Sequence, residues 1–129
     1  MMSNWKWISE STALALNNMQ IVQHGGTYGV RDDALLESAL ARAKNLAAYE
    51  DPNVFDIAAS YAFGIISNHP FLDGNKRTGL LCALVFLDDN GWEYDAPKTE
   101  TYMIVMALTQ KEIDEKTFAA WLKAHSQKN

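Results

Sequence analysis

Hydrophobic residues recur with helical spacing along most of the chain. The segment "ISESTALALNNMQIVQH" begins at a candidate cap, Ser9 or Ser11, and its apolar positions are Leu14, Leu16, Met19, Ile21 and Val22. The segment "RDDALLESALARAKNLAAYE" begins at Asp32 or Asp33 and carries leucine and alanine at the same spacing. Both patterns predict amphipathic helices. The glycine-rich "HGGTYGV" between them predicts a loop or a short hairpin.

Two more apolar segments follow, and each predicts a largely buried helix. "VFDIAASYAFGIIS" should end near Asn68 or His69, because Pro70 disfavours helical geometry in the residue before it. The next helix should run from about Asn75 to Asp89 and stop at Asn-Gly. "WEYDA" is then typical of a short strand, and "TETYMIVMALT" and "DEKTFAAWLKAH" predict two final helices. We therefore predict an all-α protein, a compact bundle of about six helices forming one domain over residues 1–129.

Composition narrows the class of protein. The chain is 48% hydrophobic and 21% charged, which is typical of a globular fold, and its net charge is −5. Because non-specific binding of nucleic acid requires a basic surface, we expect no direct nucleic-acid binding. No apolar run is long enough to span a membrane and "MMSNWKWISE" does not resemble a signal peptide, so we expect a cytoplasmic protein without membrane contact. The single cysteine, Cys82, lies in "GLLCALVFL" and should be buried.

The polar stretch "NHPFLDGNKRTG" between the two apolar helices is the candidate for chemistry. His69 lies at or just after a helix end, and histidine is the side chain that most readily exchanges a proton near neutral pH. The next helix begins near Gly74, and the free amides of a helix start after glycine bind anions well. Asp73 is a hard oxygen ligand suited to Mg²⁺ carrying phosphates. Together these are the parts of a phosphoryl or nucleotidyl transfer site.

Each of these residues also has an ordinary structural interpretation. His69 could simply end a helix, Asp73 and Gly74 could form a turn, and Asn75 could be a helix cap. Cations in the first helical turn are harder to explain, because they oppose the helix dipole. A bound anion next to Lys76 and Arg77 would remove that conflict.

The run His69-Pro70-Phe71-Leu72-Asp73-Gly74-Asn75-Lys76-Arg77-Thr78 resembles the signature of the Fic/Doc family, and the Asn-Lys-Arg-Thr part resembles its Doc form. The upstream "HGGTYGVRDDALLESALAR" also looks like the Doc form. The resemblance implies the all-helical Fic/Doc fold with a short flap. It makes His69 the general base, Phe71 a buried anchor and Asp73 the Mg²⁺ ligand. It assigns ATP phosphates to Gly74, Asn75, Lys76 and Arg77, with the Asn75 side chain assisting, and target docking to a flap of Gly25, Gly26, Thr27, Tyr28 and Gly29.

Two departures from the common Fic signature, H-x-F-x-[DE]-G-N-G-R-x-x-R, affect the implied reaction. Lys76 replaces the glycine after asparagine, and Leu80 replaces the second arginine. Fic enzymes with the full signature transfer AMP, whereas the Doc form with this lysine resembles a kinase that phosphorylates a threonine of elongation factor Tu. We therefore predict phosphoryl transfer from ATP with Mg²⁺. Protein adenylylation and a catalytically inactive binding module remain the alternatives.

The resemblance also implies a partner. Many Fic proteins carry an inhibitory helix of the form [ST]-x-x-x-E-[GN], and none of the glutamates in these 129 residues is followed by glycine or asparagine. A Doc-type toxin without that helix implies inhibition in trans by a Phd-like antitoxin. Trp5 and Trp7 have two interpretations, packing on the core or anchoring a partner.

Overall fold

The computed structural model describes residues 4–129. This part of the chain forms six helices and one small sheet, which confirms the all-α prediction. The helices are α1 (Glu10–His24), α2 (Asp33–Tyr49), α3 (Val54–Asn68), α4 (Asn75–Asp89), α5 (Lys98–Thr109) and α6 (Glu115–Ala124). Two three-residue strands, β1 (Trp92–Tyr94) and β2 (Ser126–Lys128), pair in an antiparallel manner. None of the described helices has the length and hydropathy to cross a membrane.

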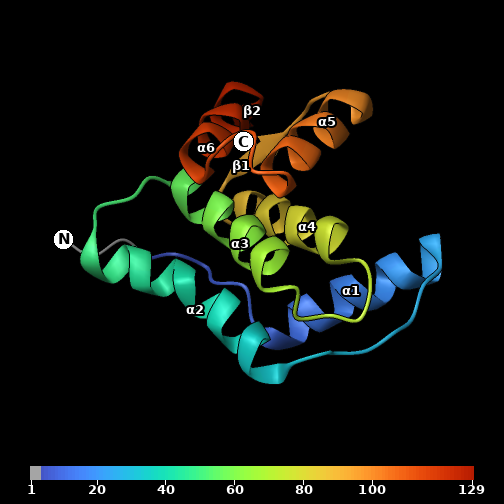
Figure 1. The fold of residues 1–129 in the computed structure, drawn as a ribbon. Helices are drawn as coiled ribbons and strands as arrows, with labels where there is room; N and C mark the ends of the chain where they lie inside the picture. The colour runs from blue at the N-terminus through green and yellow to red at the C-terminus, as the bar shows by residue number, and fades with distance from the viewer. Residues whose placement is uncertain (1–3) are drawn as a thin grey trace.

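The hydrophobic core is centred on α3 and α4, which lie side by side in the middle of the molecule (Figure 1). Helix α3 also packs against α2 and α6, and most of its residues are buried. The crossing with α4 is close because Gly79 has no side chain: a Cβ there would lie 3.1 Å from the carbonyl oxygen of Ala62. This pair of helices therefore gives the loop between them, residues 69–74, two rigid ends.

Four helices begin with a side-chain cap. Ser9, Asp32, Asn53 and Asp114 each accept a hydrogen bond from a backbone amide of the helix that follows. At α3 the cap is reciprocal, because Asp56 also accepts from the Asn53 amide. The structure thus selects Ser9 over Ser11 and Asp32 over Asp33 as the helix starts.

The segment before α1 is part of the core. The rings of Trp5 and Trp7 lie 6.0 and 6.2 Å from the ring of Phe86, and the Ile8 amide donates to the Tyr61 hydroxyl at 3.0 Å. Burial raises the pKa of Tyr61 to about 12. The packing interpretation of the two tryptophans is therefore confirmed, and both rings are partly buried against the core.

Helix α1 buries a partly polar face. Its buried positions are Ala13, Asn17 and Gln20, whereas Met19 is 42% exposed and Val22 is 77% exposed. Of the apolar positions in this helix, Leu14 and Leu16 pack against the core, but apolar spacing does not reveal the buried amides. The buried amides lie beneath the loop between α3 and α4, so this helix supports that loop as well as the core.

The short strand and the buried cysteine are present as predicted, and the glycine-rich segment is a loop. The predicted strand in "WEYDA" is confirmed as β1, but its partner β2 was not predicted. Cys82 is fully buried as expected, and burial raises its pKa to about 12. Residues 25–30 form an extended loop and not a hairpin: Val30 pairs in an isolated antiparallel bridge with Phe71.

Candidate active site

The loop between α3 and α4 is anchored by Phe71 and closed by Asn75. The Phe71 ring is fully buried, as the resemblance implied for an anchor. Its amide donates to Oδ1 of Asn75 at 2.9 Å, and Nδ2 of Asn75 donates back to the Phe71 carbonyl at 3.0 Å. Asn75 is the first residue of α4 and not its cap, so the interpretation of Asn75 as a helix cap is wrong. Its side chain instead fixes the shape of the loop.

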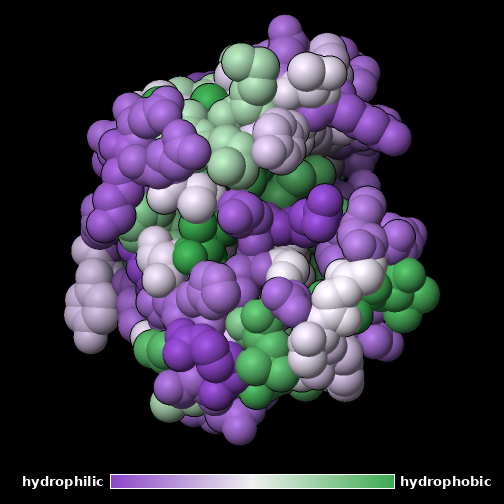
Figure 2. Space-filling view, turned by 45° about the vertical axis from the view of Figure 1, so that its right-hand side comes forward, coloured by the Kyte–Doolittle hydropathy of each residue, from purple (hydrophilic) through white to green (hydrophobic). Residues whose placement is uncertain are grey.

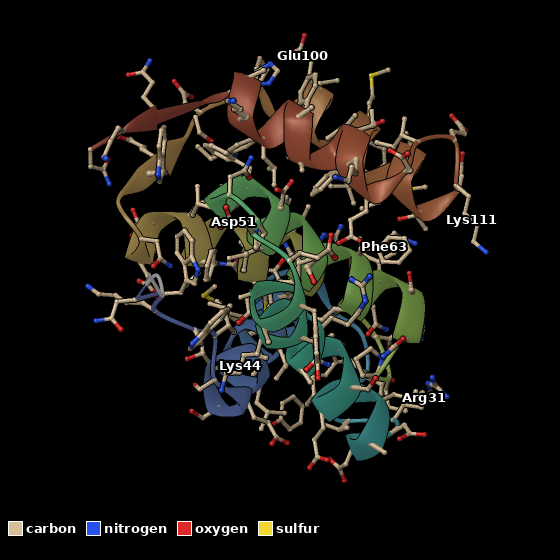
Figure 3. The ribbon with its side chains drawn as sticks, turned by 90° about the vertical axis from the view of Figure 1, so that its left-hand side faces the viewer. Arg31, Lys44, Asp51, Phe63, Glu100 and Lys111 are labelled. Carbon is tan, nitrogen blue, oxygen red and sulfur yellow. The ribbon has the colours of Figure 1, made fainter. Side chains whose placement is uncertain are left out.

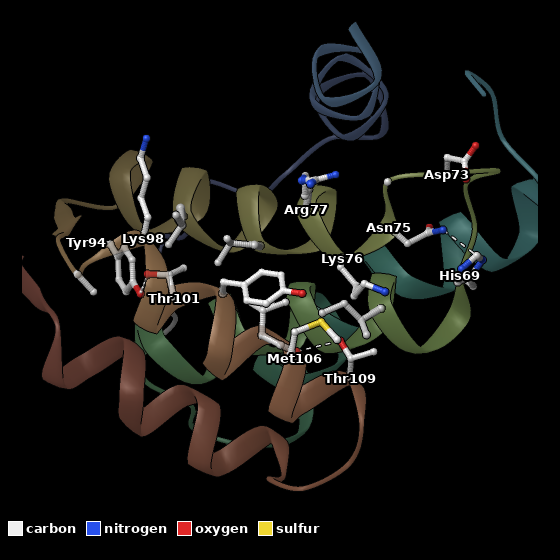
Figure 4. Close-up of a pocket in the computed structure, with 17 residues that line it drawn as sticks. His69, Asp73, Asn75, Lys76, Arg77, Tyr94, Lys98, Thr101, Met106 and Thr109 are labelled. Carbon is white, nitrogen blue, oxygen red and sulfur yellow. Dashed lines mark hydrogen bonds between the residues drawn. The ribbon is translucent and has the colours of Figure 1, made fainter. Parts of the chain in front are cut away.

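The same amide also holds His69. Nδ2 of Asn75 lies 3.1 Å from Nδ1 of His69, and the two side chains face each other (Figure 4). Because the Phe71 amide fixes which end of the Asn75 side chain carries the oxygen, Nδ2 donates and Nδ1 of His69 accepts. The neutral imidazole then carries its proton on Nε2. Both Nδ2 protons of Asn75 are engaged, so in this arrangement its side chain has no donor left for a phosphate.

The backbone of His69 is unusual. His69 ends α3 in the left-handed region, with φ 53° and ψ 52°, a conformation that few residues other than glycine adopt. Pro70, whose preceding residue avoids helical geometry, explains why α3 stops here. The His69 side chain is exposed. The geometry places an accessible imidazole at the end of a rigid helix.

The start of α4 is open to a ligand. Gly74 precedes the helix with φ 77°, and within residues 4–129 no side chain caps this helix. The first amides of α4, which have no intrahelical acceptors, therefore remain available. The positive φ favours glycine here, whereas a Cβ would make only ordinary contact with Nδ2 of Asn17, at 3.4 Å.

Two cations flank these amides. Lys76 and Arg77 are exposed and leave α4 in different directions (Figure 4). Among residues 4–129 one ion pair is found, and it joins Arg42 of α2 to Glu115 of α6, outside this loop. Lys76 and Arg77 are thus unpaired positive charges at the positive end of a helix dipole. The arrangement suits phosphate oxygens, which Arg77 can bind in a bidentate manner.

Asp73 lies between the start of α4 and the flap. One carboxylate oxygen accepts a hydrogen bond from the Thr27 amide at 2.6 Å, and the other oxygen has no recorded partner among the described residues. No cluster of three or more potential metal-binding side chains exists in residues 4–129. Mg²⁺ in a phosphate-transfer site takes few protein ligands, because phosphate oxygens and water complete its coordination, so Asp73 is the carboxylate that could hold it here.

The flap is tied to the loop by its backbone. Gly25, Gly26 and Gly29 have positive φ, and the Gly29 carbonyl accepts from the Leu72 amide at 3.0 Å. Tyr28 is 60% exposed beside this contact. The flap residues and the loop residues that the sequence singled out are therefore neighbours in the structure.

A cavity of about 740 Å³ begins at His69 and the start of α4 and runs along the groove between α4 and α5 (Figure 4). A space-filling view shows hydrophobic surface recessed between hydrophilic side chains (Figure 2). The apolar lining is Ile66, Leu80, Leu84, Val105 and Met106. At the far end Tyr94, Lys98 and Thr101 supply polar groups, and the Tyr94 hydroxyl lies 2.7 Å from the Thr101 hydroxyl. The cavity thus joins the uncapped, cationic start of α4 to an apolar groove.

Sequence reasoning missed one supporting residue of this site. Asn17 is 1% exposed, and its Nδ2 donates to the Asp73 carbonyl at 2.9 Å and to the Thr78 hydroxyl at 3.1 Å. A signal was present: Ala13, Asn17 and Gln20 share one face of α1. Two buried amides on a helical face indicate a polar neighbour that needs hydrogen bonds.

The sequence is similar to known proteins of one family. The sequence model of the Fic/DOC family matches residues 7–87. The chain is 36% identical over 93 residues to a protein called Protein kinase doc from Escherichia phage P1, covering 70% of this chain and 74% of that protein. It is 33% identical over 99 residues to a protein called Toxin Doc from Mycolicibacterium smegmatis, covering 72% of this chain and 76% of that protein.

The protein therefore belongs to the Fic/DOC family. Within that family it is a Doc-like toxin, as the Lys76 form of the signature indicated.

Proposed function

We propose that this protein transfers the γ-phosphoryl group of ATP to a serine or threonine hydroxyl of a protein target. The observation that carries the proposal is the uncapped, cationic start of α4, which lies beside His69 at one end of the cavity. Elongation factor Tu is the proposed target, and inhibition of translation the proposed outcome. In support, the relative from phage P1 is named a protein kinase.

The chain's own residues supply binding and orientation. The amides of Gly74, Asn75 and Lys76 and the guanidinium of Arg77 hold phosphate oxygens. The apolar groove between α4 and α5 accepts the nucleoside. Asp73 would hold Mg²⁺, which when bound neutralises phosphate charge.

His69 takes the proton of the attacking hydroxyl. In the resting geometry Nδ1 of His69 accepts from Asn75, so Nε2 bears the ring proton. Base catalysis therefore requires that the imidazole exchange its contact with Asn75 for the incoming hydroxyl, or turn over about its Cβ–Cγ bond. Asn75 thus sets the resting orientation of the base. The bond that breaks joins the γ-phosphorus to its bridging oxygen, and ADP leaves.

Lys76 favours phosphoryl transfer over the transfer of AMP. At this position the common Fic signature has glycine, and the lysine adds bulk and charge beside the helix start. We propose that it favours binding of the terminal phosphate next to His69. Protein adenylylation is the second candidate, because the same anion site could hold the α-phosphate. An inactive binding module is the third.

Paired labelling reactions test the reaction type. Purified protein is mixed with Mg²⁺, elongation factor Tu or bacterial lysate, and ATP labelled at the γ- or α-phosphate. Label transferred from the γ position alone supports the proposal. Label from the α position would establish AMP transfer, and no label with intact ATP binding would favour the binding module.

The matched variant is His69→Asn. Asparagine tolerates the left-handed backbone of this position but has no ring, so the fold should persist. We expect transfer to fall about 100-fold or more, as for loss of a general base, while the Kd for Mg²⁺·ATP stays within about twofold. Unchanged transfer in His69→Asn would contradict the role of His69.

A Phd-like antitoxin is the proposed partner. These residues contain no inhibitory helix of the Fic form, which favours inhibition in trans by a separate protein. The same variant provides the test: wild type expressed alone should arrest growth, and His69→Asn should not. Normal growth with abundant, ATP-active wild-type protein would argue against a toxin held in trans.

A further inference from the structure

We infer that Arg31 is a positioning residue for His69: it holds the carbonyl end of α3 so that the His69 imidazole faces Asn75 and the start of α4. The inference rests on the proposed function, because it concerns the residue proposed as the base. Arg31 lies just before α2, at the end of the molecule where that helix begins (Figure 3).

The guanidinium of Arg31 makes two hydrogen bonds to the end of α3. Nε donates to the carbonyl oxygen of His69 at 2.8 Å, and Nη2 donates to the carbonyl oxygen of Asn68 at 3.0 Å. The last carbonyls of a helix have no intrahelical partner, and a planar fork of donors can satisfy two of them together. The positive charge also lies at the negative end of the α3 dipole.

The backbone of Arg31 binds the next residue of the same loop. Its amide donates to the Pro70 carbonyl at 2.7 Å, and the Asp32 amide donates to the same oxygen at 3.1 Å. Asp32 is also the cap of α2. Arg31 therefore holds three consecutive carbonyls, those of Asn68, His69 and Pro70, and connects them to the start of α2.

His69 needs such support for a specific reason. Its left-handed backbone, φ 53°, is disfavoured for a residue with a side chain. Its ring is exposed, and the one side-chain contact recorded for it in the described residues is with Asn75. If the His69 carbonyl lost Arg31, the residue would relax toward ordinary geometry. The direction of Cβ would then change, so the whole ring would move away from Asn75 and from the start of α4. The exchange of Asn75 for the incoming hydroxyl needs the ring at that place, so its displacement slows transfer.

The position of Arg31 separates this effect from nucleotide binding. Arg31 does not line the cavity, and its side chain bonds to the end of α3 and not to α4. Loss of the side chain should therefore lower the rate of transfer from bound ATP and leave the affinity for ATP unchanged. Loss of a phosphate ligand would change affinity first.

The experiment compares Arg31→Ala and Arg31→Lys with a matched control, Arg42→Ala. Arg42 is a second arginine that bonds to α3, through the Ser60 carbonyl, and it pairs with Glu115 away from the site. In single-turnover transfer at saturating Mg²⁺·ATP, we expect Arg31→Ala to be about 10- to 100-fold slower with an unchanged Kd, because misplacement of a reacting group has effects of this size. Lysine, with the charge but no fork, should recover part of the rate.

Arg42→Ala separates positioning from loss of stability. It should lower the melting temperature and leave the rate per folded molecule unchanged. Equal slowing in both alanine variants would overturn the inference, as would an Arg31→Ala rate equal to wild type.

A second readout does not depend on activity. ¹⁵N NMR of the His69 ring should show the proton on Nε2 in the neutral wild type, and an average of both tautomers in Arg31→Ala and, to a lesser degree, in Arg31→Lys. Unchanged ring signals in Arg31→Ala would overturn the inference. If wild type transfers no phosphate but the ring signals change as expected, the proposed function fails and the positioning role stands.

Discussion

Helices α3 and α4 have the same length, 15 residues, yet they begin in opposite ways. At the start of α3, Asn53 and Asp56 satisfy each other's backbone amides in a capping box. At the start of α4, Gly74 offers no side chain, and the third helical position, held by Asp56 in α3, is Arg77. The first helix start is complete in itself, whereas the second leaves amides and a cation unpaired.

The difference shows where local stability has been given up. An acidic residue in the first turn stabilises a helix, and a cation there opposes the dipole by a similar amount. Both helices pack into the same core, so burial cannot explain the contrast. A phosphate group at the start of α4 would supply the negative charge and the acceptors that Asn53 and Asp56 supply at α3.

Arg77→Asp should have the largest effect, because it gives α4 the acidic third position of α3. We expect the Kd for Mg²⁺·ATP to rise roughly 10- to 100-fold, as loss of charge-assisted hydrogen bonds implies, and phosphoryl transfer to fall with it. The free energy of unfolding should increase by about 0.5 kcal/mol, since the new charge suits the dipole. Isothermal titration calorimetry and thermal unfolding measure the two effects. Lower stability with unchanged affinity would show that Arg77 is only a structural residue.

The two helices also differ in the ionisable group that each places in the core. Burial raises the pKa of Tyr61 in α3 from 10.0, and that of Cys82 in α4 from 9.0, to about 12 in each case. Because the folded pKa values are raised, their contribution to stability is complete below pH 9 and is lost as the pH rises toward 12. For Cys82 the loss is on the order of 1 kcal/mol per pH unit.

Urea unfolding between pH 8 and pH 11 measures this loss. Cys82→Ala should show a shallower decline than wild type. Identical slopes would mean that the Cys82 thiolate is accommodated in the folded protein.

Asn53→Ala should have the smallest effect. It alters the start of α3, whereas Arg77→Asp alters the start of α4. It removes the cap of α3, which we expect to lower the free energy of unfolding by about 1 kcal/mol and the melting temperature by about 4 °C. Affinity for Mg²⁺·ATP should not change, because the capping box lies at the opposite end of α3 from His69. A change in affinity comparable to that of Arg77→Asp would show that the two helix starts are not independent.

Local chemistry explains what the sequence predicted well. Caps at Ser9 and Asp32, the stop at Pro70 and the run from Asn75 to Asp89 depend on neighbouring residues, so short-range patterns contain them. The strand β2 could not be found in this way. Its sequence, "SQK", is polar, and it forms through pairing with β1 about 30 residues earlier in the chain.

The site was predictable as a list of residues but not as a set of contacts. The motif indicated His69, Asp73 and Arg77, yet tertiary packing decides that the Asn75 side chain faces Phe71 and His69. Asn17 was missed because apolar periodicity directs attention away from buried amides. Such positions depend on a partner more than 50 residues away, which a local pattern cannot reveal.

The two walls of the cavity come from different parts of the chain, one inside and one outside the segment that matches the family model. The loop and α4 supply the groups proposed for chemistry, and they lie within residues 7–87 apart from the last two residues of α4. The facing wall, α5, lies outside that segment and contributes Thr101, Val105 and Met106. Substitutions on α5 can therefore change what the groove accepts without moving the reacting groups. A change confined to α5 would thus give the protein a different selectivity on the same proposed chemical groups.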